Sequence, residues 1–272
     1  MTVAYARAPT VSRVHLRSTI GARIARLPPR QKRILDSVYR RLPIPPAWAY
    51  NADGMATIHF SPFLEDPEFS RLYQEVSAEW FVDEVVDVRW RMWLLTRYAR
   101  AARSLPGNYA EFGVYRGGCS KMLLATAGLE PTRRLHLFDT FAGIPDSSLT
   151  DSEREARFAG RLNDTSASYV AELLAPWDPI AQLWPGDVFE TFPAADTGAL
   201  AFVHIDLNAA APTVHVLEHA YERLVPGAIV VFDDYGFPGY EVQRDLIDAF
   251  LRDRPEDVIA LPTGQGVLTR LP

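Results

Sequence analysis

The chain is poor in cysteine and has no long hydrophobic run. Cys119 is the only cysteine among 272 residues, which excludes an intrachain disulfide and a cysteine-rich metal site. No apolar stretch approaches the roughly 20 residues that a transmembrane helix needs, and no secretory hydrophobic region is present. We therefore expect a cytoplasmic protein that does not enter a membrane. Its apolar content of 48% is enough for a full core.

Acidic residues are almost missing from the beginning of the chain. Residues 1–41 contain ten Lys or Arg and one acid, a net charge of +9, so the remainder carries −15. Such an arm suits nucleic acid, an anionic membrane, an acidic subunit or an organellar presequence. We favour an arm that packs on the acidic body of its own or a neighbouring subunit, as in a homo-oligomer. The acidic body argues against nucleic acid as a substrate, because phosphate contacts need a basic surface.

Prolines and apolar periodicity divide the chain into three parts. We expect a basic arm and irregular extension over 1–64, which prolines at 27–30 and 42–48 break into short helical pieces, and a short strand near 54–60. A helical cap over 65–107 precedes an α/β core over 108–272. The polar segment 145–169 is a candidate lid, although a solvated helix and loop would show the same pattern. Helices are expected near 66–77, 83–104 and 239–252.

The stretch from Tyr109 to Asp139 has the pattern of a nucleotide-binding βαβ unit. A short apolar strand is followed by glycines, an amphipathic helix and a second strand that ends in an acid. The pattern lacks the middle glycine of a dinucleotide site, and Tyr115 stands in its place. Glu111 adds a carboxylate where a diphosphate would be repelled. A carboxylate there suits the amino group and sulfonium of S-adenosylmethionine, although the glycines could serve only a tight turn.

Two later apolar strands also end in acids. Residues 199–206 end in Asp206, and residues 227–234 end in Asp233 and Asp234. Continuous apolar strands of this kind are typical of a covered parallel sheet, in which ligands bind beyond the carboxyl ends of the strands. Three carboxylates brought to one edge repel one another unless a cation lies between them. Oxygen ligands favour Mg²⁺, whereas each acid alone could be a helix cap or a turn residue.

Four motifs together resemble the macrocin O-methyltransferase family, whose members methylate antibiotic sugars. They are E-F-G-V-Y-R-G-G, F-D-T-F-A-G-I-P-D, F-V-H-I-D-L-N and V-V-F-D-D-Y-G-F-P-G, and the resemblance spans about residues 65–260. It implies a Rossmann-like class I methyltransferase that uses S-adenosylmethionine and Mg²⁺. The implied fold has a mostly parallel seven-stranded sheet with an antiparallel last strand, which fits a hairpin around Gly264 and Gly266, and an N-terminal helical extension.

The resemblance also implies roles for individual residues. Glu111, Gly113 and Gly117 would hold the methionine part of the cofactor, with Tyr115 in the same loop and Ser120 nearby. Asp139 would bind the ribose hydroxyls of the cofactor. Thr140 and Phe141 would flank the cofactor, Gly186 and Asp187 would lie by the adenine, and Asp206, Asp233 and Asp234 match the metal carboxylates.

One departure from the family concerns the proton acceptor. The family commonly shows D-x-D-L-Y after the fourth strand, whereas this chain has Asn208 at the second acid and Ala210 at the tyrosine. An amide cannot accept a proton at a useful pH, so Asn208 can only orient a hydroxyl or a water. His204 lies on the same side of the strand, but a buried histidine with satisfied hydrogen bonds is the commoner case. The base is undetermined.

The preferred function is therefore a Mg²⁺-dependent O-methyltransferase acting on a sugar or another diol in natural-product biosynthesis. Asp206 would be central to catalysis, because a bound metal acidifies the hydroxyl that attacks the sulfonium methyl. One alternative keeps the cofactor but methylates nitrogen or carbon without a metal. Another is a non-catalytic binding subunit with the same fold. A dehydrogenase is disfavoured by the glycine pattern.

Overall fold

The structure, a computed structural model, describes residues 48–80, 87–156 and 158–272. The chain divides into two compact units, residues 1–61 and 62–272. In the first unit, the short strands β1 (Tyr50–Ala52) and β2 (Met55–Thr57) pair in an antiparallel hairpin, so the strand expected near 54–60 is present. The basic arm and its predicted helical pieces lie outside the described residues.

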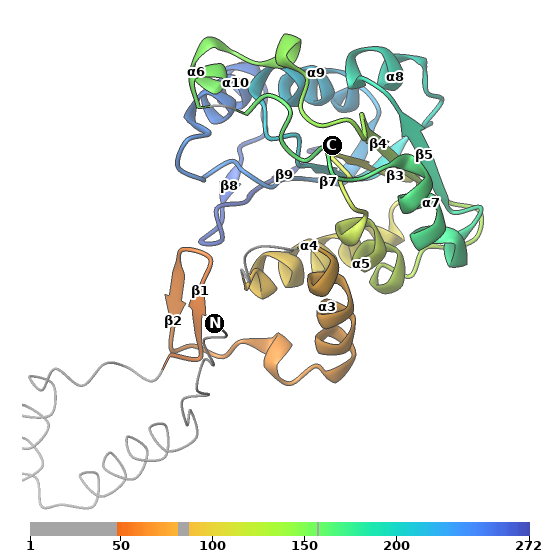
Figure 1. The fold of residues 1–272 in the computed structure, drawn as a ribbon, viewed down its shortest axis with the longest axis vertical. Coiled ribbons are helices and arrows are strands. Elements are labelled where there is room, and N and C mark those ends of the chain that lie inside the picture. Colours follow the sequence, from red (N-terminus) through yellow and green to blue (C-terminus); the bar gives the residue numbers. More distant parts are fainter. Residues whose placement is uncertain (1–47, 81–86, 157) are drawn as a thin grey trace, which may run out of the picture. The chain divides into compact units, whose positions relative to one another are not determined.

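The second unit is built on a seven-stranded sheet with the order β5-β4-β3-β6-β7-β9-β8 (Figure 1). Strands β3 to β7 run parallel, whereas β9 is antiparallel to both of its neighbours. This confirms the prediction of a mostly parallel sheet with an antiparallel last strand. The strands are β3 (Asn108–Phe112), β4 (Leu135–Asp139), β5 (Ala181–Pro185), β6 (Leu200–Ile205), β7 (Leu224–Phe232), β8 (Ile259–Ala260) and β9 (Gly266–Thr269).

Helices cover both faces of the sheet, which explains why its central strands are apolar without alternation. Every residue of β6 is buried. Helices α8 (Val188–Ala194), α9 (Ala210–Tyr221) and α10 (Glu241–Leu251) lie on one face. On the other lie α4 (Arg89–Ala101), α5 (Gly118–Thr126) and α7 (Ala167–Leu174), with α3 (Pro67–Trp80) against α5. Helix α6 (Asp151–Glu155) follows β4, and 3-10 turns occupy Pro62–Leu64, Ala102–Ser104, Asp146–Ser148 and Ala175–Trp177.

The helices α3 and α10 confirm two of the three predicted helices, but α4 begins later than expected. The pattern predicted a helix from residue 83, whereas residues 87 and 88 are not helical and α4 begins at Arg89. Asp87 accepts the backbone N–H of Arg89 at 3.1 Å and binds its guanidinium at 2.6 Å. The hydroxyl of Tyr73 accepts the N–H of Val88 at 2.9 Å. These bonds satisfy amides that the first helical turn leaves without partners.

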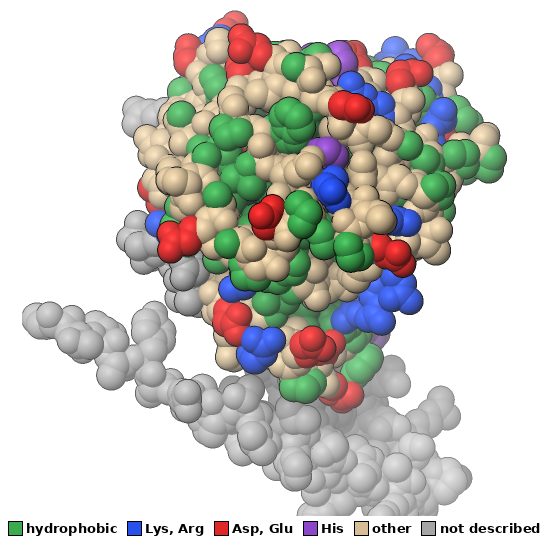
Figure 2. All heavy atoms as spheres, turned by 90° about the vertical axis from the view of Figure 1, so that its right-hand side faces the viewer, with side chains coloured by type: hydrophobic (Ala, Val, Ile, Leu, Met, Phe, Trp, Pro, Cys, Tyr) green, Lys and Arg blue, Asp and Glu red, His purple; other side chains and the backbone are tan. Residues whose placement is uncertain are grey.

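On the face in Figure 2, acidic and basic side chains occur among apolar ones. No helix in the ranges that the structure describes is long and apolar enough to cross a membrane.

The ends of β3 and β6 approach each other closely at Gly113. Its φ is +87°, and a Cβ built there would lie 1.8 Å from the carbonyl oxygen of Asp206. The neighbouring backbone is hydrogen-bonded on both sides, because Gly113 donates to Phe138 and Asp206 donates to Phe112, at 2.9 and 2.8 Å. Any side chain at residue 113 would therefore push the two strand ends apart. Glycine here is required by the approach of one strand to another.

We expect Gly113→Ala to lower the free energy of unfolding by several kcal/mol, because it combines an overlap with backbone atoms and a strained φ. Gly160→Ala is the matched control: its φ is +69°, but no atom lies within 4 Å of the added Cβ. That variant should lose about 1 kcal/mol, the cost of the left-handed backbone alone. Urea denaturation of the three proteins measures both losses. Equal losses would show that the close approach at Gly113 does not constrain the fold.

Candidate active site

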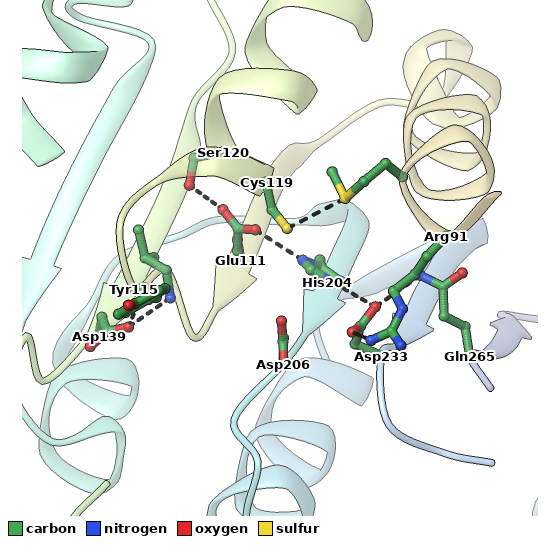
Figure 3. A network of polar contacts seen from close by, with 12 residues as sticks. Arg91, Glu111, Tyr115, Cys119, Ser120, Asp139, His204, Asp206, Asp233 and Gln265 are labelled. Atoms are coloured by element: carbon green, nitrogen blue, oxygen red, sulfur yellow. Dashed lines mark hydrogen bonds and ion pairs between the residues drawn. The ribbon is translucent and has the colours of Figure 1, made fainter. Parts of the chain in front are cut away.

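Four strands deliver acidic side chains to one region of the sheet. Glu111 lies on β3 and Asp139 ends β4, while Asp206 follows β6 and Asp233 follows β7 (Figure 3). Because parallel strands have their carboxyl ends at the same edge, these acids converge although they are far apart in the sequence. The region has two parts. One is the glycine loop, residues 113–117 between β3 and α5, which lies beside Asp139. The other is the carboxylate cluster of Asp206, Asp233 and Asp234.

Asp139 organises the glycine loop by accepting backbone amides. One carboxylate oxygen accepts the N–H groups of Val114 and Tyr115, each at 2.7 Å. The other accepts the N–H of Phe141, also at 2.7 Å. A carboxylate has about four acceptor positions, so a fourth remains for a ligand hydroxyl. The two loops that leave β3 and β4 are thus held together by one side chain.

The other residues expected to surround the cofactor lie in the loops around Asp139. Tyr115 and Phe141 both have a φ of +51°, a conformation that is uncommon for bulky residues and recurs at functional sites. Thr140 donates to the carbonyl of Gly143 at 2.8 Å. Gly186 donates its N–H to the carbonyl of Asp139 at 2.9 Å. Asp187 accepts the N–H of Phe189 at 3.0 Å as the N-cap of α8.

Glu111 is fully buried, and both of its oxygens already have partners. One accepts a hydrogen bond from the hydroxyl of Ser120, and the other lies 2.9 Å from Nδ1 of His204. The thiol of Cys119 is close to this pair, and burial followed by the charge of Glu111 raises its pKa well above the usual range. Glu111 and Ser120 were expected to contact the cofactor. The structure joins them in a buried hydrogen bond, and their contact with the cofactor stays a prediction.

The second part of the site is a cluster of three carboxylates. One oxygen each of Asp206, Asp233 and Asp234 lies within 4.8 Å of the others. Arg91 of α4 binds one oxygen of Asp233 at 2.5 Å. Gln265, in the turn between β8 and β9, donates to the other oxygen of Asp233 at 2.9 Å. Asp234 has a buried oxygen without a hydrogen-bond partner. The sequence predicted that these three acids meet, and the structure brings them together.

The charges of this cluster are unequally compensated. Burial raises the pKa of Asp206 to about 7, helped by the negative charge of Asp233. Burial, with the charges of Asp206 and Asp233, also raises the pKa of Asp234 well above its usual range. Burial disfavours the charged form of Asp233 too, but Arg91 and His204 outweigh it and hold its pKa low. A further cation is needed if all three acids are to be ionised at neutral pH.

His204 links the buried glutamate to this cluster. Its Nε2 lies 3.8 Å from Asp233, an ion-pair distance that is too long for a hydrogen bond. Burial favours the neutral ring, yet Asp233 and Glu111 outweigh it and raise the pKa of His204 to about 10. The ring is fully buried and its two nitrogens face Glu111 and Asp233. These contacts argue against His204 as the proton acceptor.

Asn208 lies beside Asp206 in the loop after β6. Its amide donates to one oxygen of Asp206 at 3.0 Å, and its own oxygen accepts from the hydroxyl of Tyr240 at 2.9 Å. This placement fits the expectation that Asn208 can orient neighbouring groups but cannot remove a proton.

Sequence reasoning missed several residues that shape the site. Arg91 had no local signal, because α4 also carries Arg89, Arg97 and Arg100 and nothing in the pattern distinguishes the one that binds Asp233. Gln265 and Tyr240 had no local signal, because their partners are 32 residues away in each case. Glu153 also escaped notice: it is buried and accepts the N–H of Ala210 at 2.8 Å. That bond attaches the candidate lid to the first turn of α9.

Comparison with known sequences agrees with this geometry. The model of the macrocin O-methyltransferase (TylF) family matches residues 91–255. An 8-demethyl-8-(2,3-dimethoxy-α-L-rhamnosyl)-tetracenomycin-C 4′-O-methyltransferase from Streptomyces olivaceus is 32% identical over 62% of this chain and 67% of its own length. A mycinamicin III 3″-O-methyltransferase from Micromonospora griseorubida is 30% identical over 61% and 69%, respectively.

Solved structures agree on the fold. The calicheamicin methyltransferase CalS11 has a TM-score of 0.60 and 24% identity, over 78% of this chain and 94% of that protein. The O-methyltransferase TomG from Streptomyces achromogenes, solved in complex with S-adenosylmethionine, has a TM-score of 0.51 and 17% identity over 78% and 95%. The fold is that of class I methyltransferases, and the resemblance seen in the sequence motifs is confirmed. With the family model spanning more than half of its length, this chain belongs to the macrocin O-methyltransferase family and is an S-adenosylmethionine-dependent methyltransferase.

Proposed function

We propose that this protein transfers a methyl group from S-adenosylmethionine to a hydroxyl of a sugar or a similar diol, and that Mg²⁺ assists the transfer. The observation that carries the proposal is the cluster of Asp206, Asp233 and Asp234 beside the glycine loop at one edge of the sheet. The relatives named above methylate the 4′ and 3″ oxygens of their substrates, one of which is named as a rhamnosyl compound. A place in natural-product biosynthesis follows from the same relatives.

The cofactor belongs in the glycine loop. Asp139 has one acceptor position left after binding three amides, which suits a ribose hydroxyl. Gly113, Tyr115 and Gly117 form the backbone turn beside the methionine part, and the Glu111 carboxylate lies on β3, two residues before this turn. The four other residues proposed for this site are Thr140 and Phe141 beside the cofactor, and Gly186 and Asp187 near the adenine.

The carboxylate cluster fits a divalent cation. It offers oxygen ligands from three side chains, two of them with raised pKa values and one with an unpartnered buried oxygen. These are the features of a site with excess negative charge. Bound there, Mg²⁺ would lower the pKa of an acceptor hydroxyl and offset the charge of the acids.

The residues of the chain position the two reactants. The acceptor oxygen forms its bond to the methyl carbon as the sulfur–carbon bond breaks and the electron pair stays on sulfur, and the hydroxyl proton passes to water or to a carboxylate of the cluster. Asp206 lies between the glycine loop and Asp233 in Figure 3, where it can orient the hydroxyl. Because His204 is buried and Asn208 is an amide, we assign neither of them as the base. The catalytic contribution is mainly orientation and electrostatics.

One observation favours a second candidate function. Arg91 already supplies a cation at 2.5 Å from Asp233, so the acids are partly neutralised by the protein itself. A metal-independent methyltransferase that acts on nitrogen or carbon would need no further charge. The response of activity to a chelator distinguishes the two candidates.

We expect Asp206→Ala to reduce methyl transfer at least a hundredfold, the order of magnitude of a lost catalytic electrostatic contact. The Kd for S-adenosylhomocysteine should change by less than about threefold. Transfer of labelled methyl groups to a rhamnosylated acceptor, with Mg²⁺ and with excess chelator, measures the first effect, and calorimetry measures the second. Asp245→Ala, on the exposed face of α10, is the control. Full activity of Asp206→Ala, or of the wild type in chelator, would contradict the metal assignment.

A second prediction concerns the glycine loop. Asp139→Asn places an amide NH₂ against backbone N–H donors, so we expect the affinity for S-adenosylhomocysteine to fall about tenfold or more. Asp196→Asn is the matched control, because Asp196 also accepts an N–H two residues ahead, from Gly198, but in a loop before β6. Calorimetric titration of both variants gives the answer. Wild-type affinity in Asp139→Asn would remove Asp139 from the cofactor site.

A further inference from the structure

The side chain of Asn208 is held at both ends. Its Nδ2 donates to Oδ1 of Asp206 at 3.0 Å, and its Oδ1 accepts the hydroxyl of Tyr240 at 2.9 Å. Its backbone has a φ of +55°, a conformation that asparagine tolerates better than most residues. An amide has a donor end and an acceptor end, so it can connect a hydroxyl to a carboxylate without a change of charge. An aspartate in the same position has no donor for Asp206.

Tyr240 is itself fixed by packing. Its ring lies 5.4 Å from that of Phe158, and it packs against the buried cluster of Leu149, Phe158 and Ala209. Burial, followed by the charge of Asp234, raises the pKa of Tyr240 to about 12, so the hydroxyl keeps its proton and remains a donor at neutral pH. A chain of two hydrogen bonds therefore runs from a packed ring to a carboxylate of the cluster.

The segment after β4 supports the same ring. Ile144 accepts the N–H of Gly160 at 2.9 Å and donates to Arg161 at 3.1 Å, which closes the base of this loop. Phe158 belongs to the loop, and Glu153 attaches it to Ala210 at the start of α9. Ala209 is small and packs in the same cluster, beside Leu149 and the aromatic pair. The position of Tyr240 thus depends on the segment after β4, which supplies Leu149 and Phe158 but none of the three clustered carboxylates.

We propose that Asn208 and Tyr240 are a positioning pair for Asp206: Tyr240 holds Asn208, Asn208 binds Oδ1 of Asp206, and Oδ2 of Asp206 is left for the acceptor. The inference rests on the proposed function, because it needs Asp206 to act on the acceptor hydroxyl. In this arrangement Asn208 donates a hydrogen bond to Asp206, and Tyr240 acts on Asp206 only through Asn208. Neither is a proton acceptor.

The test compares the kinetics of Tyr240→Phe and Asn208→Asp with the wild type, using S-adenosylmethionine and a rhamnosylated acceptor. Tyr240→Phe removes only the hydroxyl, and we expect kcat to fall about three- to tenfold, the effect of one hydrogen bond. Asn208→Asp sets a carboxylate against Oδ1 of Asp206, so kcat should fall more than tenfold. The KM for the cofactor and the Kd for S-adenosylhomocysteine should stay within about twofold of the wild-type values.

Tyr221→Phe is the matched control. Tyr221 also donates a buried hydroxyl to an acid, Glu256 at 2.7 Å, but at the end of α9 away from the cluster. We expect this variant to lower the Tm and to leave kcat unchanged. A Tyr240→Phe protein that loses only thermal stability, as Tyr221→Phe does, would show that Tyr240 has a structural role alone and would overturn the inference.

The remaining outcomes are also decisive. An Asn208→Asp protein with a kcat equal to or above that of the wild type would show that this position favours a carboxylate, contrary to the proposed donor role. A wild-type protein that binds S-adenosylhomocysteine but methylates no sugar or diol would contradict the proposed function itself, and with it the inference. A fall of kcat in both variants with unchanged cofactor binding supports the positioning pair.

Discussion

Repulsion among acids at one edge of a parallel sheet is the constraint on which the rest of this site depends. Asp206, Asp233 and Asp234 are brought together by strand order and can all stay ionised only if positive charge is supplied. The protein supplies part of it through His204 and Arg91. Both residues lie against Asp233, and His204 also binds Glu111. The pKa of Asp233 is therefore held low, while the pKa values of Asp206 and Asp234 remain raised. We propose that the remaining deficit of positive charge would be met by a bound cation.

Backbone geometry keeps the two halves of the site adjacent. Gly113, directly after β3, lies against the carbonyl of Asp206, directly after β6. This contact joins the glycine loop to the loop that carries Asp206 and Asn208. Asp139 fixes the loop on the other side of Gly113 by accepting three amides. A methyl donor and its acceptor must be held within contact distance along one line. The close packing of these strand ends provides that rigidity without any side chain at residue 113.

Much of this arrangement could be predicted from the sequence because it follows from local pattern. Apolar strands that end in acids specify both the parallel sheet and the convergence of Asp206, Asp233 and Asp234 at one edge. The start of α4 at Arg89 could not be predicted, since it depends on the Tyr73 hydroxyl and on Asp87 rather than on periodicity. The roles of Arg91, Gln265 and Tyr240 depend on contacts between distant segments. The chemistry of an amide shows from the sequence alone that Asn208 cannot be a base. Its bonds to Asp206 and Tyr240 could not be predicted, because the bond to Tyr240 again depends on a distant segment.

The central claim is that the three carboxylates hold a divalent cation next to the methyl donor. Crystals grown with S-adenosylhomocysteine and Mn²⁺ test it directly, because manganese can be located by its anomalous scattering. The account predicts one strong anomalous peak among Asp206, Asp233 and Asp234, with oxygen ligands at about 2.1 to 2.2 Å, close to Mg²⁺ distances, and with the cofactor product against the glycine loop. Cofactor product in the loop with no peak at the cluster would contradict the claim. The charge at these acids would then be balanced by Arg91 and His204 alone.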